Sequence, residues 1–186
     1  MRIIAGHCKG MKLQVPAGRA VRPTSDLLRG AIMSMLGGFF EGERVLDLCA
    51  GTGAVALEFI SRGCARAVVV ENDAAALELL VHNIAHTRQK DKVELLALDV
   101  LTALEQLRQR KEKFELIYFD PPYVSELYAP VLQFLHAGDL LAPAAEVIVE
   151  SHYGVDDALL GPAWQRVFKR RYGSTTLERF HWIQGL

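Results

Sequence analysis

The sequence predicts an α/β fold: a seven-stranded, mostly parallel sheet with helices on both faces, preceded by a short N-terminal β-hairpin. Two observations predict this sheet. From residue 43 onward, near-continuous apolar runs alternate with helix-like segments, which is typical of parallel strands buried on both faces. The last two strand-like segments have no helix between them, so we expect them to close the sheet antiparallel. A chain of 186 residues is long enough for one such domain with a full core.

The expected elements follow one another in a regular order. Two short strands around Gly10 precede a helix over residues 22–36, which Thr24 or Ser25 can cap. The strands of the main sheet are expected at residues 44–49, 67–71, 93–98, 114–119, 145–151, 165–173 and 175–183. The helices between them are expected at residues 54–62, 74–86, 100–110 and 126–136.

Charge is distributed unevenly along the chain. The whole sequence carries a net charge of −1, but residues 1–30 alone carry +5, which leaves −6 for the remainder. A basic arm on an acidic body is typical of a protein that contacts phosphates. We therefore expect residues 1–22 to be a basic β extension that recognises RNA, and residues 23–186 to be the main α/β domain.

Other features exclude several classes of protein. No apolar run approaches the roughly 18–20 residues of a membrane helix, and the first residues are broken by charge and glycine. We therefore expect a cytoplasmic protein with no membrane contact. Cys8, Cys49 and Cys64 have neither paired nor metal-binding spacing, and the histidines show no ligand pattern, so no metal is expected.

Ligand-type residues follow three consecutive predicted strands, whose carboxyl ends should share one edge of the sheet. The glycine turn in VLDLCAGTGA lacks the spacing of dinucleotide-binding loops and the Lys of a phosphate-binding loop. Glu71 can accept hydrogen bonds from two ribose hydroxyls, and Asp99 from an amine such as that of adenine. An adenosine with an amino-acid tail fits these residues, which makes S-adenosylmethionine the expected cofactor. The residues expected to bind it are Asp47, Ala50, Gly51, Gly53, Glu71, Asn72, Asp99 and Val100.

The fourth predicted strand ends in FDPPY. A residue before proline is extended and proline has no N–H, so this loop presents two acceptors, the Asp120 carboxylate and the Pro121 carbonyl. Two fixed acceptors suit an amino group on a ring, because hydrogen bonds to its N–H groups free its lone pair for a methyl electrophile. Tyr123 offers a face on which an extruded base can stack. The candidate catalytic residues are therefore Asp120, Pro121, Pro122 and Tyr123.

The order and spacing of VLDLCAGTGA, VVEND and FDPPY resemble the class I S-adenosylmethionine-dependent methyltransferases, which have a Rossmann-like fold. RIIAGHCKGMKL, RPTSDLLRGAI and YGSTTLERF resemble one family within that class, the bacterial 16S rRNA guanine-N2 methyltransferases of the RsmD type. The resemblance runs from Arg2 to about Phe180. It implies methylation of a specific guanine in 16S rRNA, within a 30S subunit or an assembly intermediate, and we expect a monomer. Lys9, Leu27 and Cys49 depart from the usual pattern. The first two bear on RNA contacts, and none touches the chemistry.

Recognition of the RNA falls to the basic arm and the first helix, because no separate recognition domain is evident. The residues expected to contact the substrate are Arg2, Lys9, Lys12, Arg22, Thr24, Ser25 and Arg29. Three alternatives stay open: an adenine-N6 methyltransferase on RNA or DNA, a non-catalytic RNA-binding module, and a small-molecule methyltransferase. The target nucleotide and the roles of Lys169, Arg170 and Arg171 are also open.

Overall fold

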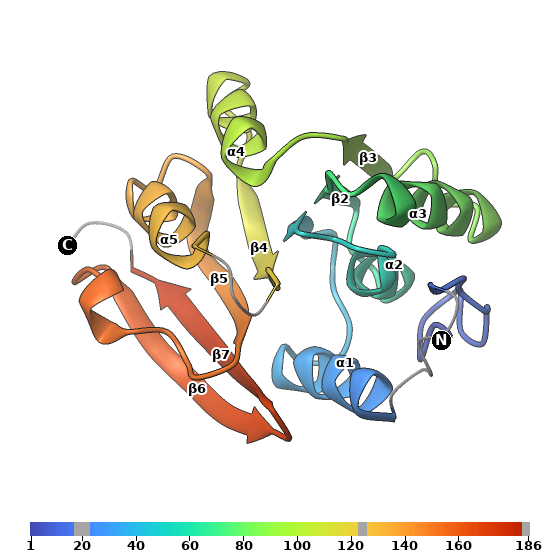
Figure 1. Cartoon of the computed structure of the whole chain (residues 1–186), viewed down its shortest axis with the longest axis horizontal. Coiled ribbons are helices and arrows are strands. Elements are labelled where there is room, and N and C mark those ends of the chain that lie inside the picture. The colour runs from blue at the N-terminus through green and yellow to red at the C-terminus, as the bar shows by residue number, and fades with distance from the viewer. Residues whose placement is uncertain (17–22, 123–125, 184–186) are drawn as a thin grey trace.

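The computed structural model describes residues 1–16, 23–122 and 126–183; the side chains of residues 23–25 lie outside this description. Seven strands form one sheet in the order β3-β2-β1-β4-β5-β7-β6 (Figure 1). Strands β1 to β5 are parallel to their neighbours, and β7 runs antiparallel to β5 and β6, so the predicted sheet is confirmed. The strands are β1 (Arg44–Leu48), β2 (Arg66–Val70), β3 (Val93–Leu96), β4 (Phe114–Phe119), β5 (Leu141–Ser151), β6 (Trp164–Tyr172) and β7 (Thr175–Trp182).

Helices cover both faces of the sheet, as Figure 1 shows. On one face, α1 (Pro23–Met35), α2 (Ala54–Ser61) and α3 (Ala74–His86) pack around a core that includes Phe59. On the other face, α4 (Val100–Gln109) and α5 (Tyr128–His136) pack around Phe114 and Phe119. A short 3-10 helix, η1 (Asp157–Leu159), precedes β6. Each of these fully buried rings contributes about 1.5–3 kcal/mol relative to an exposed one.

Strand β5 begins four residues earlier than expected, at Leu141 rather than at residue 145. Its pairing with β4 shifts register between Phe114 and Leu116, and Ala144 in the shifted segment has a φ of 58°. Pro143 cannot donate a hydrogen bond to a neighbouring strand, so its presence in the sequence indicates the end of a strand. A bulge accommodates it here, and the strand continues past it.

The N-terminal segment differs from the expected pair of strands. It forms a single antiparallel bridge between Arg2 and Lys12, with turns between them. The chain turns onto the end of α2 instead of extending, because the His7 N–H donates to the Ser61 carbonyl at 2.9 Å. Gly6 allows this approach: its φ is +81°, and a Cβ there would lie 1.7 Å from the Ser61 carbonyl oxygen.

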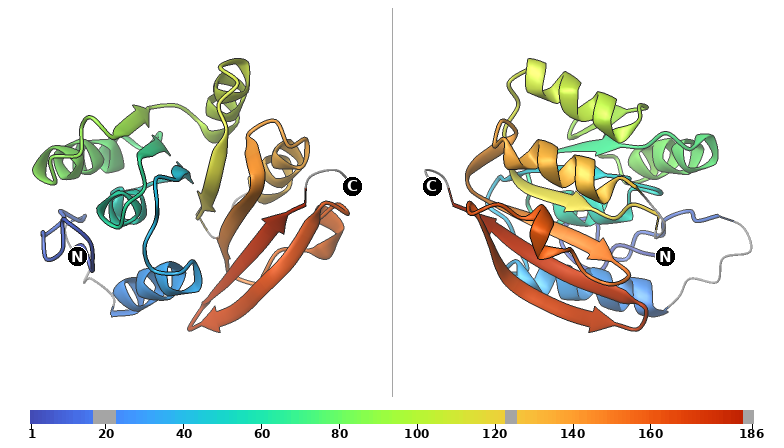
Figure 2. Two further views of the ribbon diagram at one scale, coloured as in Figure 1. Left: turned by 180° about the vertical axis from the view of Figure 1, so that it is seen from behind. Right: turned by 60° about the vertical axis from the view of Figure 1, so that its left-hand side comes forward.

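The views in Figure 2 place the carboxyl ends of β1, β2 and β4 on the same side of the molecule. This is the edge at which parallel α/β sheets bind ligands, and it is where the predicted site residues follow their strands. Among the described residues, none of the helices is long and apolar enough to cross a membrane.

Candidate active site

The glycine turn after β1 is hydrogen-bonded directly to the acid after β2. The Gly51 N–H donates to Glu71 Oε2 at 2.7 Å. The N–H groups of Asn72 and Asp73 donate to Glu71 Oε1 at 2.8 and 2.9 Å. Because Leu48 and Val70 are paired in register, the turn and the acid leave adjacent strands at the same level. Glu71 therefore holds the turn in place from the neighbouring strand.

The turn itself is built from left-handed backbone. Cys49, Gly51 and Gly53 have φ angles of 65°, 55° and 76°. A Cβ on Gly53 would lie 2.3 Å from Leu80 Cδ1, so this glycine is required for packing. A Cβ on Gly51 would meet nothing within 4 Å, which leaves open space over its backbone. Cys49 has a side chain, so the left-handed conformation strains its backbone. Strain of this kind is common at functional sites.

Asp47 is fully buried beneath this turn. Its Oδ2 accepts a hydrogen bond from the Ala56 N–H at 3.2 Å, while its Oδ1 has no hydrogen-bond partner among the described residues. Burial raises the pKa of Asp47 well above its usual range, and the nearby Asp120 and Glu71 carboxylates add to the shift. A cationic amino group at this edge would relieve that accumulated negative charge.

Asp99 and Val100 lie where β3 passes into α4, beside the end of β2. Asp99 caps α4, since its Oδ1 accepts from the Thr102 N–H at 3.0 Å. Hydrogen bonds from the Thr102 side chain and backbone hold the pKa of Asp99 below its usual value. The Asp99 side chain is exposed, so it can accept a hydrogen bond from a ligand while it caps α4.

These acceptors fit S-adenosylmethionine. The cofactor offers an ammonium group, two ribose hydroxyls and an adenine amine, all of them hydrogen-bond donors. The edge offers the carboxylates of Asp47, Glu71 and Asp99 on three adjacent strands, together with open space above Gly51. The match of donors to acceptors supports the residues predicted from the sequence, although each individual contact stays a prediction.

The sequence reasoning missed a second acid beside Asp120. Phe119 pairs with Val149, so Asp120 and Glu150 follow at the same level on adjacent strands. The Tyr118 hydroxyl donates to the buried Glu150 carboxylate, and the Tyr128 hydroxyl donates to the Glu150 carbonyl at 2.9 Å. The signal for Glu150 was an acid ending the apolar run VIVES.

Burial changes the titration of this acidic pair. It raises the pKa of Asp120 to about 7 and that of Glu150 to about 8, and the charge of Asp120 contributes to the Glu150 shift. The Asp120 N–H lies 3.5 Å from the Leu48 carbonyl oxygen, which puts this pair next to the glycine turn. Pro121 is buried and Pro122 is exposed, while Tyr123 lies outside the described residues.

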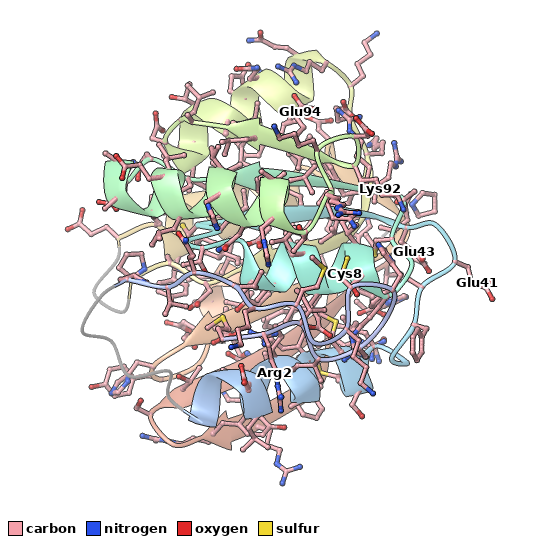
Figure 3. The ribbon with its side chains drawn as sticks, turned by 90° about the vertical axis from the view of Figure 1, so that its right-hand side faces the viewer. Arg2, Cys8, Glu41, Glu43, Lys92 and Glu94 are labelled. Atoms are coloured by element: carbon pink, nitrogen blue, oxygen red, sulfur yellow. The ribbon has the colours of Figure 1, made fainter. Side chains whose placement is uncertain are left out.

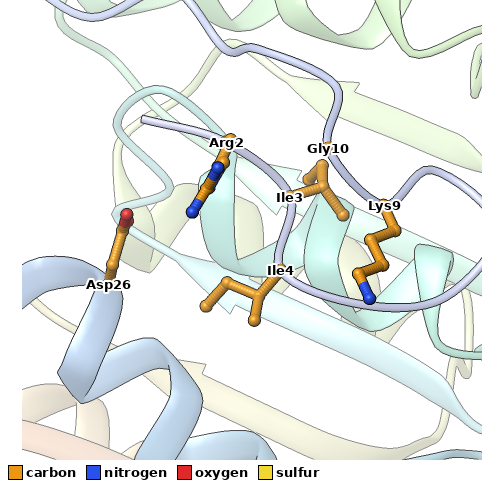
Figure 4. A pocket seen from close by; sticks show the side chains of 6 residues that line it. All are labelled: Arg2, Ile3, Ile4, Lys9, Gly10 and Asp26. Atoms are coloured by element: carbon orange, nitrogen blue, oxygen red, sulfur yellow. The ribbon is translucent and has the colours of Figure 1, made fainter.

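Three of the predicted RNA-binding cations are exposed on the N-terminal segment. They are Arg2, Lys9 and Lys12. Arg2 and Lys9 line a cavity of about 310 Å³ between this segment and α1, together with Ile3, Ile4, Gly10 and Asp26 (Figure 4). Arg22 and the side chains of Thr24 and Ser25 lie outside the described residues.

The expectation that Arg29 contacts RNA is wrong, because its side chain is buried and only 3% exposed. Its guanidinium donates to the Arg2 carbonyl at 2.6 Å and to Asp26 at 3.0 Å, and it lies 3.4 Å from Glu58. Glu58 also accepts from the N–H groups of Ile4 and Ala5 at 2.8 and 3.0 Å. Arg29 therefore helps fix the N-terminal segment to α1 and α2.

The same segment is packed into the core of the main domain. Ile3, Cys8 and Leu13 are buried in the cluster that contains α1, α2 and α3. Figure 3 shows Cys8 beside α2 and Arg2 over α1. The Gln14 N–H donates to Asn83 of α3 at 2.8 Å. The basic side chains are thus carried on a segment held rigidly against three helices.

Comparisons with known proteins show which proteins the whole chain resembles. The chain is 32% identical over 151 residues to ribosomal RNA small subunit methyltransferase D of Escherichia coli (strain K12), covering 81% of this chain and 74% of that protein. It is 28% identical over 152 residues to the protein of the same name from Haemophilus influenzae, covering 81% and 78%. The solved structure of yhhF from Escherichia coli superposes with a TM-score of 0.86 at 26% identity, covering 100% of this chain and 99% of that one.

The fold and the site together define a class I S-adenosylmethionine-dependent methyltransferase. The chain belongs to the RsmD-type family described as "Conserved hypothetical protein 95", whose model matches residues 1–181.

Proposed function

We propose that this protein transfers a methyl group from S-adenosylmethionine to the exocyclic N2 amine of a guanine in 16S rRNA of the small ribosomal subunit. One observation carries the proposal. Asp120 and its two prolines follow β4, whose neighbour β1 carries the glycine turn, so acceptors for an amine lie beside the cofactor edge. Relatives named ribosomal RNA small subunit methyltransferase D support RNA as the substrate.

The residues of this edge would act on the amine as follows. When bound, S-adenosylmethionine supplies an electrophilic methyl group. The Asp120 carboxylate and the Pro121 carbonyl accept hydrogen bonds from the two N–H groups of the amine and orient its lone pair. As the N–C bond forms, the methyl–sulfur bond of the cofactor would break and leave S-adenosylhomocysteine. The methylated nitrogen becomes acidic, and Asp120 would accept the proton that it loses. Glu150, at the same level on the next strand, is a second group that can hold a proton there.

The exposed cations Arg2, Lys9 and Lys12 belong, in this proposal, to an RNA-recognition element over residues 1–22 that is carried by the main domain. Phosphate contacts release counterions, so RNA affinity falls steeply as salt rises. Replacing Arg2, Lys9 and Lys12 together with Gln should flatten that salt dependence and leave cofactor affinity unchanged. A loss of cofactor affinity in the triple variant would show that the segment serves the fold rather than the RNA.

A second candidate substrate is an adenine N6 amine, because two fixed acceptors serve that amine equally well. Naked 16S rRNA and isolated 30S particles, incubated with labelled cofactor and digested to nucleosides, separate the two candidates. N2-methylguanosine supports the proposal, and N6-methyladenosine supports the second candidate. Comparing naked RNA with 30S particles also tests whether the substrate is an assembled particle. We propose that the protein acts as a monomer.

A further inference from the structure

The tip of the β6–β7 hairpin lies at the same edge of the sheet as the acidic pair. β7 is antiparallel to both β5 and β6, so β6 ends at the edge where β4 and β5 end. The right-hand view of Figure 2 shows the hairpin tip on the same side of the molecule as the end of β4. Lys169, Arg170 and Arg171 are therefore brought from near the end of the chain to the active-site edge.

The strand registers give the position of Arg170 more closely. Leu177 of β7 pairs with Glu150 of β5 on one side and with Arg170 of β6 on the other. Asp120, Glu150 and Arg170 thus lie in one row across the sheet. At about 4.8 Å between neighbouring strands, Arg170 stands three strands, or roughly 14 Å, from Asp120. A strand of RNA with its target base at Asp120 can therefore also reach this tip.

The tip is exposed and its charge is largely free. Lys169, Arg170 and Arg171 are all exposed. Within the described part of the chain, Lys169 alone of the three has an acidic partner, with its Nζ 3.4 Å from Glu178. The Arg170 guanidinium lies 5.3 Å from the centre of the Tyr172 ring, and Arg171 Nε donates to the Gly173 carbonyl at 3.0 Å. These contacts orient two cations without neutralising them.

The loop after β5 brings an exposed aromatic residue next to Lys169. Tyr153, in the loop after β5, is 84% exposed. The next residue, Gly154, touches the Lys169 side chain, since a Cβ there would lie 2.6 Å from Lys169 Nζ. Exposed aromatic rings that accompany cations bind single-stranded nucleic acid by stacking on its bases. The set Tyr153, Lys169, Arg170 and Arg171 is called the hairpin-tip patch below.

We propose that the hairpin-tip patch is a second RNA-binding surface, which holds phosphates of the strand that flanks the target nucleotide. The inference rests on the proposed function, since it assigns a further contact to the same substrate. Arginine suits phosphate because its planar fork donates two hydrogen bonds to one group. The patch is a strong local cation cluster on a body whose residues 31–186 carry a net charge of −6.

The test is a salt titration of RNA binding by the wild type and by the double variant Arg170→Gln/Arg171→Gln. Each phosphate contact in single-stranded RNA contributes about 0.7 to the slope of log affinity against log salt. The double variant should therefore lose about 1.4 from that slope. Its KM for RNA should rise while its affinity for S-adenosylmethionine is unchanged. The matched control is Lys90→Gln/Lys92→Gln, which removes two exposed charges from the opposite edge, before β3.

Several outcomes separate this inference from the proposed function. A slope that matches the wild type and the control overturns the hairpin-tip patch while RNA methylation by the wild type stands. If the wild type neither binds nor methylates RNA, the proposed function fails and the patch fails with it. Arg171→Gln alone guards against a folding defect, because within the described residues the Arg171 side chain bonds a turn carbonyl and no acidic group. It should lose about 0.7 from the slope, and an unchanged slope counts against the patch.

Discussion

The N–H of Gly51 and the carboxylate of Glu71 are joined by a hydrogen bond of 2.7 Å that spans two adjacent strands. Glu71 also accepts from Asn72 and Asp73, so it organises the backbone on both sides of the cofactor edge. The backbone that borders the open space at Gly51 is therefore held in one conformation. A preformed edge of this kind lowers the ordering cost of binding the cofactor.

Glu71→Ala should weaken S-adenosylmethionine binding by about 1–3 kcal/mol, the usual scale for hydrogen bonds to a charged group. The loss has two sources, because the variant removes the ribose acceptor and releases the Gly51 turn. Calorimetric titration with S-adenosylmethionine measures it. Glu78→Ala, which removes an exposed acid from α3, is the control and should bind like the wild type. Equal affinities of the two variants would leave Glu71 with no part in the cofactor site.

Asp120→Asn should abolish methyl transfer while cofactor affinity stays within a few-fold of the wild type. The carboxylate must be ionised to accept from the amine, and burial raises its pKa to about 7. The wild-type single-turnover rate should therefore fall about tenfold per pH unit below 7 and level off above it. A rate independent of pH between 5 and 9 would contradict this role for Asp120. So would a large loss of cofactor affinity in the variant.

Glu150→Gln should make the protein less sensitive to alkaline pH. The pKa of Glu150 is raised by burial to about 8, so the stability that this acid contributes is complete below its unfolded pKa. That stability is lost progressively between the unfolded pKa of 4.5 and the folded pKa of about 8, because in this window the unfolded chain has released the proton that the folded protein still holds. The variant should gain up to about 5 kcal/mol in free energy of unfolding at pH 9 relative to the wild type, and little at pH 5, since each pKa unit corresponds to about 1.4 kcal/mol.

Urea unfolding at the two pH values measures this difference. The control variant Glu78→Gln removes an exposed acid from α3, and its stability should follow the wild-type pH dependence. If Glu150→Gln and the wild type lose the same stability between pH 5 and 9, Glu150 does not titrate in the buried pair.

Glu58→Gln should destabilise the fold by about 3–5 kcal/mol, the usual cost of leaving buried partner charges without their counterion. Glu58 is completely buried and faces two cations, Arg29 and Arg62, at 3.4 and 2.7 Å. Amide hydrogen exchange should also rise at Ile4 and Ala5, whose N–H groups Glu58 holds. A variant as stable as the wild type, with unchanged exchange, would show that Glu58 does not fix the N-terminal segment.

The sheet could be predicted from the sequence because its signals are local and repeated. Strand β4 and helix α3 have the bounds expected from their apolar patterns. Candidate cofactor residues could also be named from the sequence, because they lie at the ends of their strands and the topology brings them to one edge; their contacts with the cofactor stay a prediction. The family resemblance was confirmed over residues 1–181.

What was missed depends on contacts between distant segments. Arg29 looked like a surface cation because the sequence does not show that Glu58, 29 positions later, lies against it. The two N-terminal strands were expected from local pattern; they pair around Arg2 and Lys12, while Glu58 and Ser61 accept hydrogen bonds from the N–H groups of the residues between. Glu150 was overlooked because its importance comes from the register of β5 against β4, which residue spacing alone does not give.

The most direct test of the central claim is single-turnover transfer of a labelled methyl group to 30S particles, followed by nucleoside analysis of the 16S rRNA. The wild type should place the label in N2-methylguanosine. Asp120→Ala should bind the cofactor equally well and leave the RNA unlabelled. Label in N6-methyladenosine, or undiminished label with Asp120→Ala, would contradict the account.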